Sequence, residues 1–404
     1  MNETSETETT MRRADRYMFR TYGRFPVTLV RGEGCRVWDE EGNEYLDFVA
    51  GIAVCALGHS APLVTRVLEE QSRKLVHVSN LYYTRPQTEL ARLLVENSFA
   101  DRVFFCNSGA EANEAAIKLA RRYAGEKSGP KRHVIISMEN SFHGRTMATL
   151  SATGQKKIQA GYDPLLDGFR FVPFNDPDRL AEAMDESVCA VIMEPIQGEG
   201  GVVCPEPGYL EKVRALCDAR GAALIFDEVQ VGMGRTGRLF CHEHYGVTPD
   251  IMTLAKAMGN GLPIGAMLAT EEMGKAFGPG SHATTFGGTP LVTAVSGAVL
   301  RSLLEDGVIA HCAAVGKYFR GRLEDLAGRH ECVREVRGMG LILGMELDRP
   351  CAPVVSRCMA EGFLVNCAQE RVLRFIPPLI VTEAEIDRLI TVLDRILGEM
   401  ETPA

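Results

Sequence analysis

Short apolar runs alternate with longer helical stretches through the middle of the chain. The runs are rich in β-branched and aromatic residues and are almost continuously apolar, which is typical of strands buried on both faces. They cover Arg102–Cys106, His133–Ser137, Ala190–Met193, Ala223–Phe226 and Ile264–Ala269. Helical stretches such as Glu111–Tyr123 and Gly208–Arg220 lie between several of them. This alternation predicts an α/β fold with a mostly parallel sheet that is flanked by helices.

The two ends of the chain have a different pattern. Residues 27–48 contain three short strand-like runs with a turn at 41–43, which predicts a β-meander. From about residue 301 helices dominate, with strands near Leu341–Leu347 and Leu373–Ile376. We therefore expect a large α/β domain over 57–300 and a smaller α+β domain built from 16–56 and 301–404. The polar, acidic start predicts a disordered tail over residues 1–15.

Composition limits the possible functions. The 404 residues are 46% hydrophobic and carry a net charge of −9, which argues against nucleic acid as a partner because phosphate binding needs a basic surface. The longest apolar stretch, Phe48 to Gly58, is too short to span a bilayer, and the start lacks the basic and apolar pattern of a secretory signal. The twelve cysteines form no C-x-x-C pair. We expect reduced, mostly buried thiols in a cytoplasmic protein.

Polar residues that follow the strands are the candidates for chemistry, because ligands bind at the carboxyl ends of parallel strands. Asn107-Ser108-Gly109-Ala110-Glu111 follows the first strand, and Ser108 with Glu111 fits a capping box. The free N–H groups and dipole of such a helix start suit a phosphate. An ordinary capped helix would have the same pattern.

Two further residues, considered with the candidate phosphate site, point to a particular cofactor. Asp227 ends an apolar strand, where a carboxylate needs a cationic partner from the protein or from a ligand such as a protonated pyridine. Lys256 lies among apolar and small residues, which favour a neutral amine that can form a Schiff base. Taken alone, Asp227 could form a structural ion pair and Lys256 could be a surface lysine. Together, the phosphate site, carboxylate and amine are the three features that bind pyridoxal phosphate.

Seven segments carry a resemblance to a known family. They are NSGAEANEAAIKLAR (107–121), FHGRTMATLSATGQ (142–155), EPIQGEGG (194–201), DEVQVGMGRTG (227–237), LAKAMGNGLPIGA (254–266), TTFGGTP (284–290) and LRFIPP (373–378). From about Tyr22 to Gly398, the chain resembles the class III, ornithine-type aminotransferases of fold type I. The resemblance implies a seven-stranded type of sheet in the large domain, the cofactor pyridoxal 5′-phosphate, and a homodimer with shared active sites.

The resemblance also implies roles for cofactor-binding residues. Lys256 would bind the cofactor covalently and move a proton, and Asp227 would pair with the pyridinium nitrogen. Gly109 and Ala110 would bind the phosphate, with Ser108 as the helix cap. The remaining cofactor contacts would come from Phe142 and Val229 on the two faces of the ring, Gln230 near its 3′ oxygen, Glu228 beside them, and Thr285 reaching the phosphate in the other subunit.

Four residues are expected to bind substrate. Arg145 would bind the α-carboxylate of the amine donor, with Thr284 nearby, and Arg374 would bind the α-carboxylate of 2-oxoglutarate or glutamate. Glu199 would neutralise Arg374 while the donor is bound and move away for the dicarboxylate. Within the family, the expected donor is N2-acetylornithine, with transfer of its δ-amino group as in arginine biosynthesis. Ornithine, succinylornithine, succinyl-diaminopimelate and 4-aminobutyrate remain alternatives.

Several other interpretations are weaker. His143 invites an acid/base role, but structural hydrogen bonding is favoured. Cys241-His242-Glu243-His244 could suggest a metal site, but it lacks a second ligand pair. The glycines of VGMGRTG could suggest a dinucleotide-binding loop, but such a loop is followed by a helix and no clear helix follows here. Val231, Thr289 and Ser60-Ala61 depart from the usual family residues without removing a cofactor contact. A semialdehyde aminomutase and a non-catalytic binding protein are the alternatives from other functional classes.

Overall fold

A computed structural model describes residues 6–401 of the chain. Its first element is helix α1 (Glu6–Tyr17), which lies where we expected a disordered tail up to residue 15. Residues 1–5 of that tail lie outside the described residues. The helix is almost wholly exposed, and Arg12 lies 3.8 Å from Glu8 one turn earlier. Such i,i+4 pairs favour a surface helix even where little is buried.

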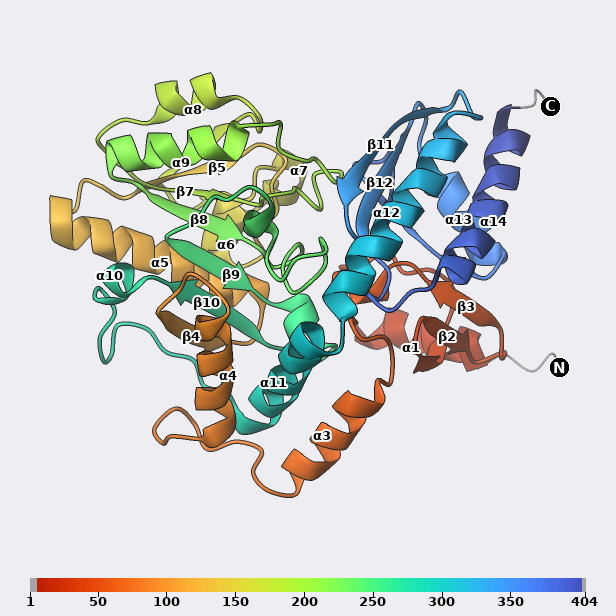
Figure 1. Ribbon diagram of the computed structural model, residues 1–404, viewed down its shortest axis with the longest axis horizontal. Helices are drawn as coiled ribbons and strands as arrows, with labels where there is room; N and C mark the ends of the chain where they lie inside the picture. Colours follow the sequence, from red (N-terminus) through yellow and green to blue (C-terminus); the bar gives the residue numbers. More distant parts are fainter. Residues whose placement is uncertain (1–5, 402–404) are drawn as a thin grey trace.

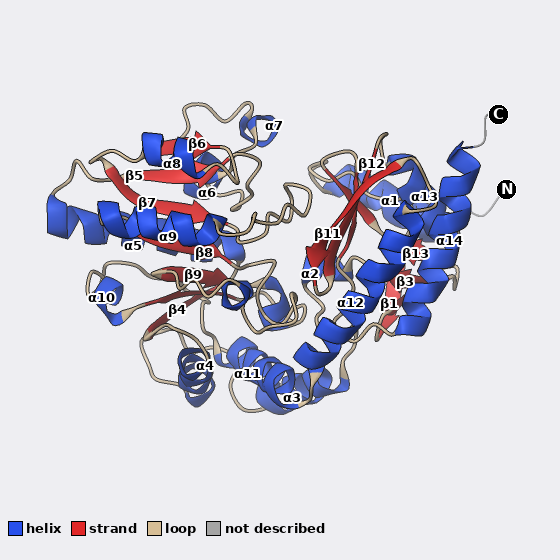
Figure 2. Cartoon of the chain, turned by 45° about the horizontal axis from the view of Figure 1, so that its top comes forward, coloured by secondary structure: helices blue, strands red, loops and turns tan. Residues whose placement is uncertain are grey.

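The large domain is built on one seven-stranded sheet (Figures 1 and 2). The strand order is β4–β10–β9–β8–β7–β5–β6. All neighbours are parallel except β10, which runs antiparallel to β4 and β9. In that order the strands span Arg102–Cys106, Gly265–Ala269, Ile251–Leu254, Ala223–Asp227, Val188–Met193, Val134–Met138 and Phe169–Val172.

Helices cover both faces of this sheet. Helix α5 (Gly109–Ser128) packs on the face that carries Ile135 and Ile192. Helices α8 (Pro177–Ala183) and α9 (Tyr209–Arg220) pack on the opposite face with Ile136. Successive strand residues point to opposite faces, so continuous apolar runs are needed to fill both layers. This explains why the central strands lack polar alternation.

The remaining elements of the large domain surround the sheet. Helix α11 (Pro290–Glu305) packs against both α3 (Pro62–Ser72) and α4 (Arg85–Glu96) below the sheet in Figure 1. The short elements of this domain are α6 (Met147–Ala152), α7 (Lys156–Gln159), α10 (Glu271–Gly274) and the 3₁₀ turns η1 (Cys241–His244) and η2 (Lys256–Gly259). The short helix α2 (Ala50–Ala53), from the N-terminal part, contacts η2.

The smaller domain joins the two ends of the chain. Strands β1 (Leu29–Glu33), β2 (Arg36–Asp39) and β3 (Glu44–Asp47) form a sheet in that order, and β13 (Phe363–Leu364) from the C-terminal part pairs with β3 at its edge. A second sheet has the order β11–β12–β15–β14, spanning Val333–Met339, Ile342–Leu347, Val372–Phe375 and Asn366–Ala368. Helices α12 (Val308–Ala327), α13 (Ala352–Ala360) and α14 (Glu383–Glu401) pack around these strands.

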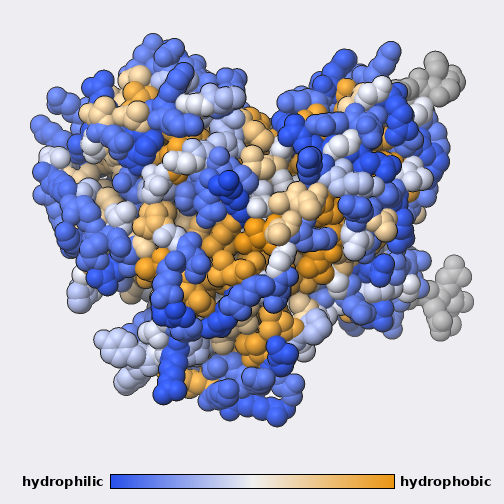
Figure 3. Space-filling model, viewed as in Figure 1, coloured by the Kyte–Doolittle hydropathy of each residue, from blue (hydrophilic) through white to orange (hydrophobic). Residues whose placement is uncertain are grey.

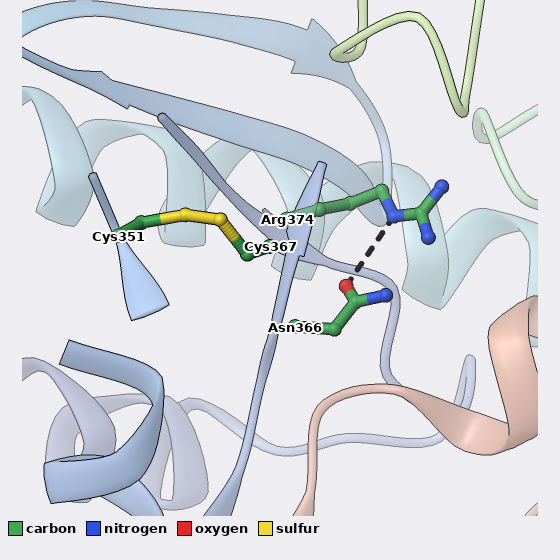
Figure 4. Close-up of a disulfide and its surroundings, with 4 residues drawn as sticks. All are labelled: Cys351, Asn366, Cys367 and Arg374. Atoms are coloured by element: carbon green, nitrogen blue, oxygen red, sulfur yellow. Dashed lines mark hydrogen bonds between the residues drawn. A yellow bond between two sulfur atoms is a disulfide. The ribbon is translucent and has the colours of Figure 1, made fainter. Parts of the chain in front are cut away.

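One cysteine pair corrects the expectation that all thiols are reduced. Cys351, just before α13, and Cys367, in β14, form a disulfide with their Cα atoms 6.1 Å apart (Figure 4). They are 16 residues apart in the chain, and no spacing motif marks them, because the fold brings them together. Most of the other cysteines are buried, and burial raises the pKa of the Cys106 thiol to about 12. Within residues 6–401 no helix is both long and apolar enough to cross a membrane.

Candidate active site

A cavity of about 470 Å³ lies at the carboxyl edge of the large sheet. Its wall is formed by segments that directly follow β4, β5, β7, β8 and β9. The fold therefore places segments that are far apart in sequence around one space, as expected at this edge of a parallel sheet. Most of the residues singled out in the sequence line this cavity.

The start of α5 forms one end of the cavity. Ser108 accepts a hydrogen bond from the Glu111 N–H at 3.1 Å, and the Glu111 carboxylate accepts from the Asn107 N–H at 2.6 Å. The first bond is the Ser108 cap expected from the sequence, but the second comes from Asn107 and not from the Ser108 N–H, so the reciprocal bond of the expected capping box is replaced by one to the preceding residue. A Cβ on Gly109 would lie 2.7 Å from the Val229 side chain, so only glycine permits this close approach. The helix start is thus open to the cavity and suited to an anion.

Asp227 is held by three hydrogen bonds at the end of β8. Its Oδ2 accepts from Asn113 Nδ2 at 2.7 Å and lies 2.8 Å from His143 Nδ1, while Oδ1 accepts from the Val229 N–H at 3.1 Å. The residue is 3% exposed. His143 therefore has the structural hydrogen bond favoured by the sequence analysis. Asn113 was missed there, although a polar residue among the alanines of α5 was a signal for it.

Lys256 starts η2 at the cavity wall. Its φ is 45°, a value uncommon for a residue other than glycine and often found where function requires a particular backbone position. Burial is the main reason that the pKa of its amine is lowered, although Glu199 acts in the opposite direction. The lowered pKa increases the neutral, nucleophilic fraction of the amine.

Phe142 and Val229 line the same cavity. The N–H of Phe142 donates to Glu194 at 3.0 Å, and the other oxygen of Glu194 accepts from the Gly198 N–H at 3.1 Å. Burial raises the pKa of Glu194 to about 7. This carboxyl group links the Phe142 segment to the turn that carries Glu199. Sequence reasoning quoted its segment but assigned Glu194 no role.

Arg374 lies behind the cavity in β15 and is 1% exposed. Its Nη1 donates to Glu199 Oε1 at 2.6 Å and to Gln230 Oε1 at 3.2 Å. Burial alone would raise the pKa of Glu199, but the charge and hydrogen bond of Arg374 leave it lowered. The structure thus brings together the predicted arginine–glutamate pair and adds Gln230, which was expected beside the cofactor ring.

The remaining predicted substrate residues differ in position. Arg145 lines the cavity, is exposed, and has its guanidinium carbon 5.6 Å from the centre of the Phe142 ring. Thr284 and Thr285 precede α11 and do not line the cavity of this chain. Thr284 Oγ1 accepts from Asn107 Nδ2 at 3.2 Å, and Thr285 is exposed.

Glu228 points away from the cavity, in contrast to its expected cofactor contact. Its carboxylate accepts from the N–H groups of Cys241 and His242 at 2.6 and 2.8 Å and lies 2.8 Å from His242 Nδ1. Glu228 follows Asp227 directly, so the two side chains leave the strand end in different directions. Among residues 6–401 no group of three His, Cys, Asp or Glu side chains is arranged to hold a metal.

The groups around the cavity fit pyridoxal phosphate. An open helix start faces the phosphate position, a buried carboxylate offers a partner for a ring nitrogen, and an amine with a lowered pKa lies at the wall. Phe142 and Val229 supply apolar surface for the ring.

Comparison with known proteins agrees with this site. The family described as Aminotransferase class-III matches residues 17–397. An acetylornithine aminotransferase of Caldanaerobacter subterraneus is 53% identical, covering 95% of this chain and 98% of its own. An N-acetylornithine aminotransferase structure from Stenotrophomonas maltophilia is 40% identical, with a TM-score of 0.83 over 96% of this chain and 99% of that one.

Another solved structure is less similar in sequence but superposes better on the backbone of this chain. It is an ornithine aminotransferase of Toxoplasma gondii, which holds PLP at partial occupancy in its active site. It is 34% identical, with a TM-score of 0.94 over 98% of this chain and 95% of that one. The family match spans nearly the whole chain, and the cavity contains the groups that the chemistry needs. The chain belongs to the class III aminotransferases.

Proposed function

We propose that this enzyme transfers the δ-amino group of N2-acetyl-L-ornithine to 2-oxoglutarate in a ping-pong cycle that depends on pyridoxal 5′-phosphate. The products are N-acetylglutamate 5-semialdehyde and glutamate, and the reaction belongs to arginine biosynthesis. Acetylornithine aminotransferases that are about half identical over nearly the full length support this donor. The observation that carries the two-substrate cycle is the Arg374–Glu199 ion pair at the cavity.

The cofactor would be held by residues from several strand ends. The N–H groups of Gly109 and Ala110, at the helix start capped by Ser108, would bind its phosphate. Asp227 would keep the ring nitrogen protonated, and the bonds from Asn113 and His143 would fix that carboxylate. Phe142 and Val229 would pack on the two faces of the ring. When bound, pyridoxal phosphate supplies a ring that withdraws electrons from the carbon that loses a proton.

Lys256 would act twice. Its neutral amine would bind the cofactor aldehyde, and after substrate replaces it, the same amine would carry a proton between the reacting carbons. A lowered pKa serves both steps, because an amine that stays protonated neither attacks nor accepts a proton.

The two arginines would separate the substrates. Arg145, which is exposed at the mouth of the cavity, would bind the α-carboxylate of acetylornithine, with Thr284 nearby. Arg374 would remain neutralised by Glu199 while this donor is bound. For 2-oxoglutarate or glutamate, Glu199 would move away and Arg374 would bind the α-carboxylate. A single cavity can then accept one substrate with an apolar acyl chain and another with a second negative charge.

The proposed movement of Glu199 on and off Arg374, called the gate below, predicts the effect of Glu199→Gln. Removing the negative charge frees Arg374 for dicarboxylates, so we expect the ratio of kcat/KM for glutamate to that for acetylornithine to rise about 10- to 100-fold. Stopped-flow measurement of the two half-reactions checks this. Glu211→Gln, at an exposed position of α9, is the control. An unchanged ratio would contradict the gate.

A comparison of donors tests the proposed substrate. With 2-oxoglutarate as acceptor, we expect kcat/KM for acetylornithine to exceed that for ornithine, succinylornithine, succinyl-diaminopimelate and 4-aminobutyrate. One acyl or methylene difference contributes about 1–3 kcal/mol in an apolar pocket, so differences of about 10- to 100-fold are expected. A higher value for any of the other donors would assign the enzyme to that substrate.

We also propose that the enzyme is a cytoplasmic homodimer. Large exposed hydrophobic residues concentrate between α3 and α4, namely Leu75, Val76, Leu81, Tyr82 and Tyr83. Exposed Phe286, from the segment before α11, lies beside them with its ring centre 5.2 Å from that of His77. Hydrophobic residues also gather across the middle of the face seen in Figure 3. A contiguous exposed apolar surface is typical of an interface.

The dimer would place Thr285 against the partner's cofactor phosphate, which accounts for its exposed position outside the cavity of its own chain. Sedimentation equilibrium should then give twice the chain mass of 44.2 kDa. A fully active monomer would contradict the shared site.

A further inference from the structure

Arg374 has hydrogen-bond partners besides Glu199. When Glu199 leaves, a guanidinium that is 1% exposed loses its only carboxylate partner within the described residues. Gln230 still accepts from Nη1 at 3.2 Å, but this bond restrains only one corner of the group. A buried cation needs further hydrogen bonds to stay ordered and to present its fork to a carboxylate.

Asn366 supplies that restraint from the neighbouring strand. It is the registered partner of Arg374 in the antiparallel pair β14–β15, so the two side chains lie on the same face of the sheet. Figure 4 shows them side by side, with Arg374 Nε donating to Asn366 Oδ1 at 3.3 Å. If the amide is turned over, Oδ1 accepts from Nη2 at 2.8 Å and Nδ2 donates to the Arg374 carbonyl at 3.2 Å. In both orientations the amide oxygen holds the edge of the guanidinium away from Glu199.

The chemistry of an amide suits this position. Asn366 accepts a hydrogen bond without neutralising the charge, so the full positive charge of Arg374 remains for an incoming carboxylate. An aspartate at the same place would compete permanently with the substrate. Asn366 thus orients the guanidinium of Arg374, whereas Glu199 neutralises its charge.

The disulfide holds the strand that carries Asn366. Cys367 is the next residue, and its side chain leaves β14 in the opposite direction to join Cys351 before α13 (Figure 4). The Cys351 N–H also donates to the Glu370 carbonyl at 2.9 Å. Strand β14 has only three residues and pairs on one side with β15. The covalent link therefore anchors a short edge strand whose own hydrogen bonds are few.

We propose that Asn366 is a positioning residue for the acceptor half-reaction, which orients Arg374 after Glu199 departs, and that the Cys351–Cys367 disulfide anchors its strand. This inference rests on the proposed binding of the dicarboxylate by Arg374. It assigns Asn366 no contact with the donor, so its effect is confined to one half of the cycle.

Half-reaction kinetics of Asn366→Ala and Asn366→Asp holoenzymes test the proposal. For Asn366→Ala we expect KM for glutamate and 2-oxoglutarate to rise about 10-fold, and for Asn366→Asp about 100-fold, because the added charge neutralises Arg374. The acetylornithine half-reaction should stay within about twofold of wild type in both. A purely structural residue would change both halves together, and that result, or unchanged dicarboxylate kinetics, would overturn the proposal.

Two further variants show whether a negative result concerns Arg374, Asn366 or the disulfide. Arg374→Ala should raise KM for glutamate and 2-oxoglutarate by more than about 100-fold. If it does not, the proposed binding role of Arg374 fails, and the positioning role of Asn366 fails with it. If Arg374→Ala has its effect and the Asn366 variants have none, only the positioning proposal fails. Cys351→Ser/Cys367→Ser should raise the dicarboxylate KM in the same direction by about 2- to 5-fold, and an unchanged value would overturn the anchor.

Discussion

Lys256→Ala is expected to lower kcat by more than about 10⁴-fold, because one amine provides both the covalent attachment of the cofactor and the proton transfer. The variant should also lose the visible absorption that arises when the cofactor is bound to lysine, while still folding. Its position explains the size of the effect: the amine lies at the cavity wall on a backbone with φ of 45° and has a lowered pKa. No other described lysine lines this cavity.

Turnover and absorption spectra of Lys256→Ala, compared with Lys212→Ala, check this expectation. Lys212 is exposed on α9, and its replacement should leave both properties unchanged. A Lys256→Ala enzyme that keeps the absorption band and turnover would show that another group performs these steps.

Asp227→Asn is expected to have the second-largest effect, a fall in kcat of about 10³-fold, because an amide cannot stabilise a protonated ring nitrogen as a carboxylate does. The side chain is 3% exposed and already holds bonds from Asn113 and the Val229 N–H. The carboxylate is therefore held in a fixed orientation in a place that water does not screen.

The matched control for this variant is Asp218→Asn. Asp218 has a side chain that is 65% exposed and pairs with Arg214 on the surface, where such an ion pair contributes little. Steady-state kinetics and cofactor affinity should change only for Asp227→Asn. If both variants kept wild-type kcat, the ring nitrogen would not depend on this carboxylate.

Much of the large domain could be predicted because its signals are local. Apolar runs gave five of the strands, and the Ser108 cap gave the start of α5 and its open N–H groups. The chemistry of Asp227 and Lys256 followed from polar residues at strand ends. Strand β6 is short and only partly buried, so the pattern did not single it out.

The features that were missed depend on contacts between distant segments. Asn113 and Glu194 gain their roles from partners that lie far away along the chain. The direction of Glu228 is decided by the turn at Cys241, and the disulfide by the return of β14 toward α13. Helix α1 differs for another reason: composition alone suggested disorder over 1–15, whereas residues from Glu6 onward form a helix with a surface i,i+4 pair, Arg12–Glu8.

Transfer of labelled nitrogen tests the central claim most directly. Acetylornithine carrying ¹⁵N at its δ-nitrogen is incubated with the holoenzyme and unlabelled 2-oxoglutarate, and the products are identified by mass spectrometry. The account predicts labelled glutamate and N-acetylglutamate 5-semialdehyde in equal amounts over many turnovers, and, without 2-oxoglutarate, no glutamate and no more than one equivalent of semialdehyde per active site. Label retained in a rearranged donor, released as ammonia, or left in unchanged acetylornithine would contradict it.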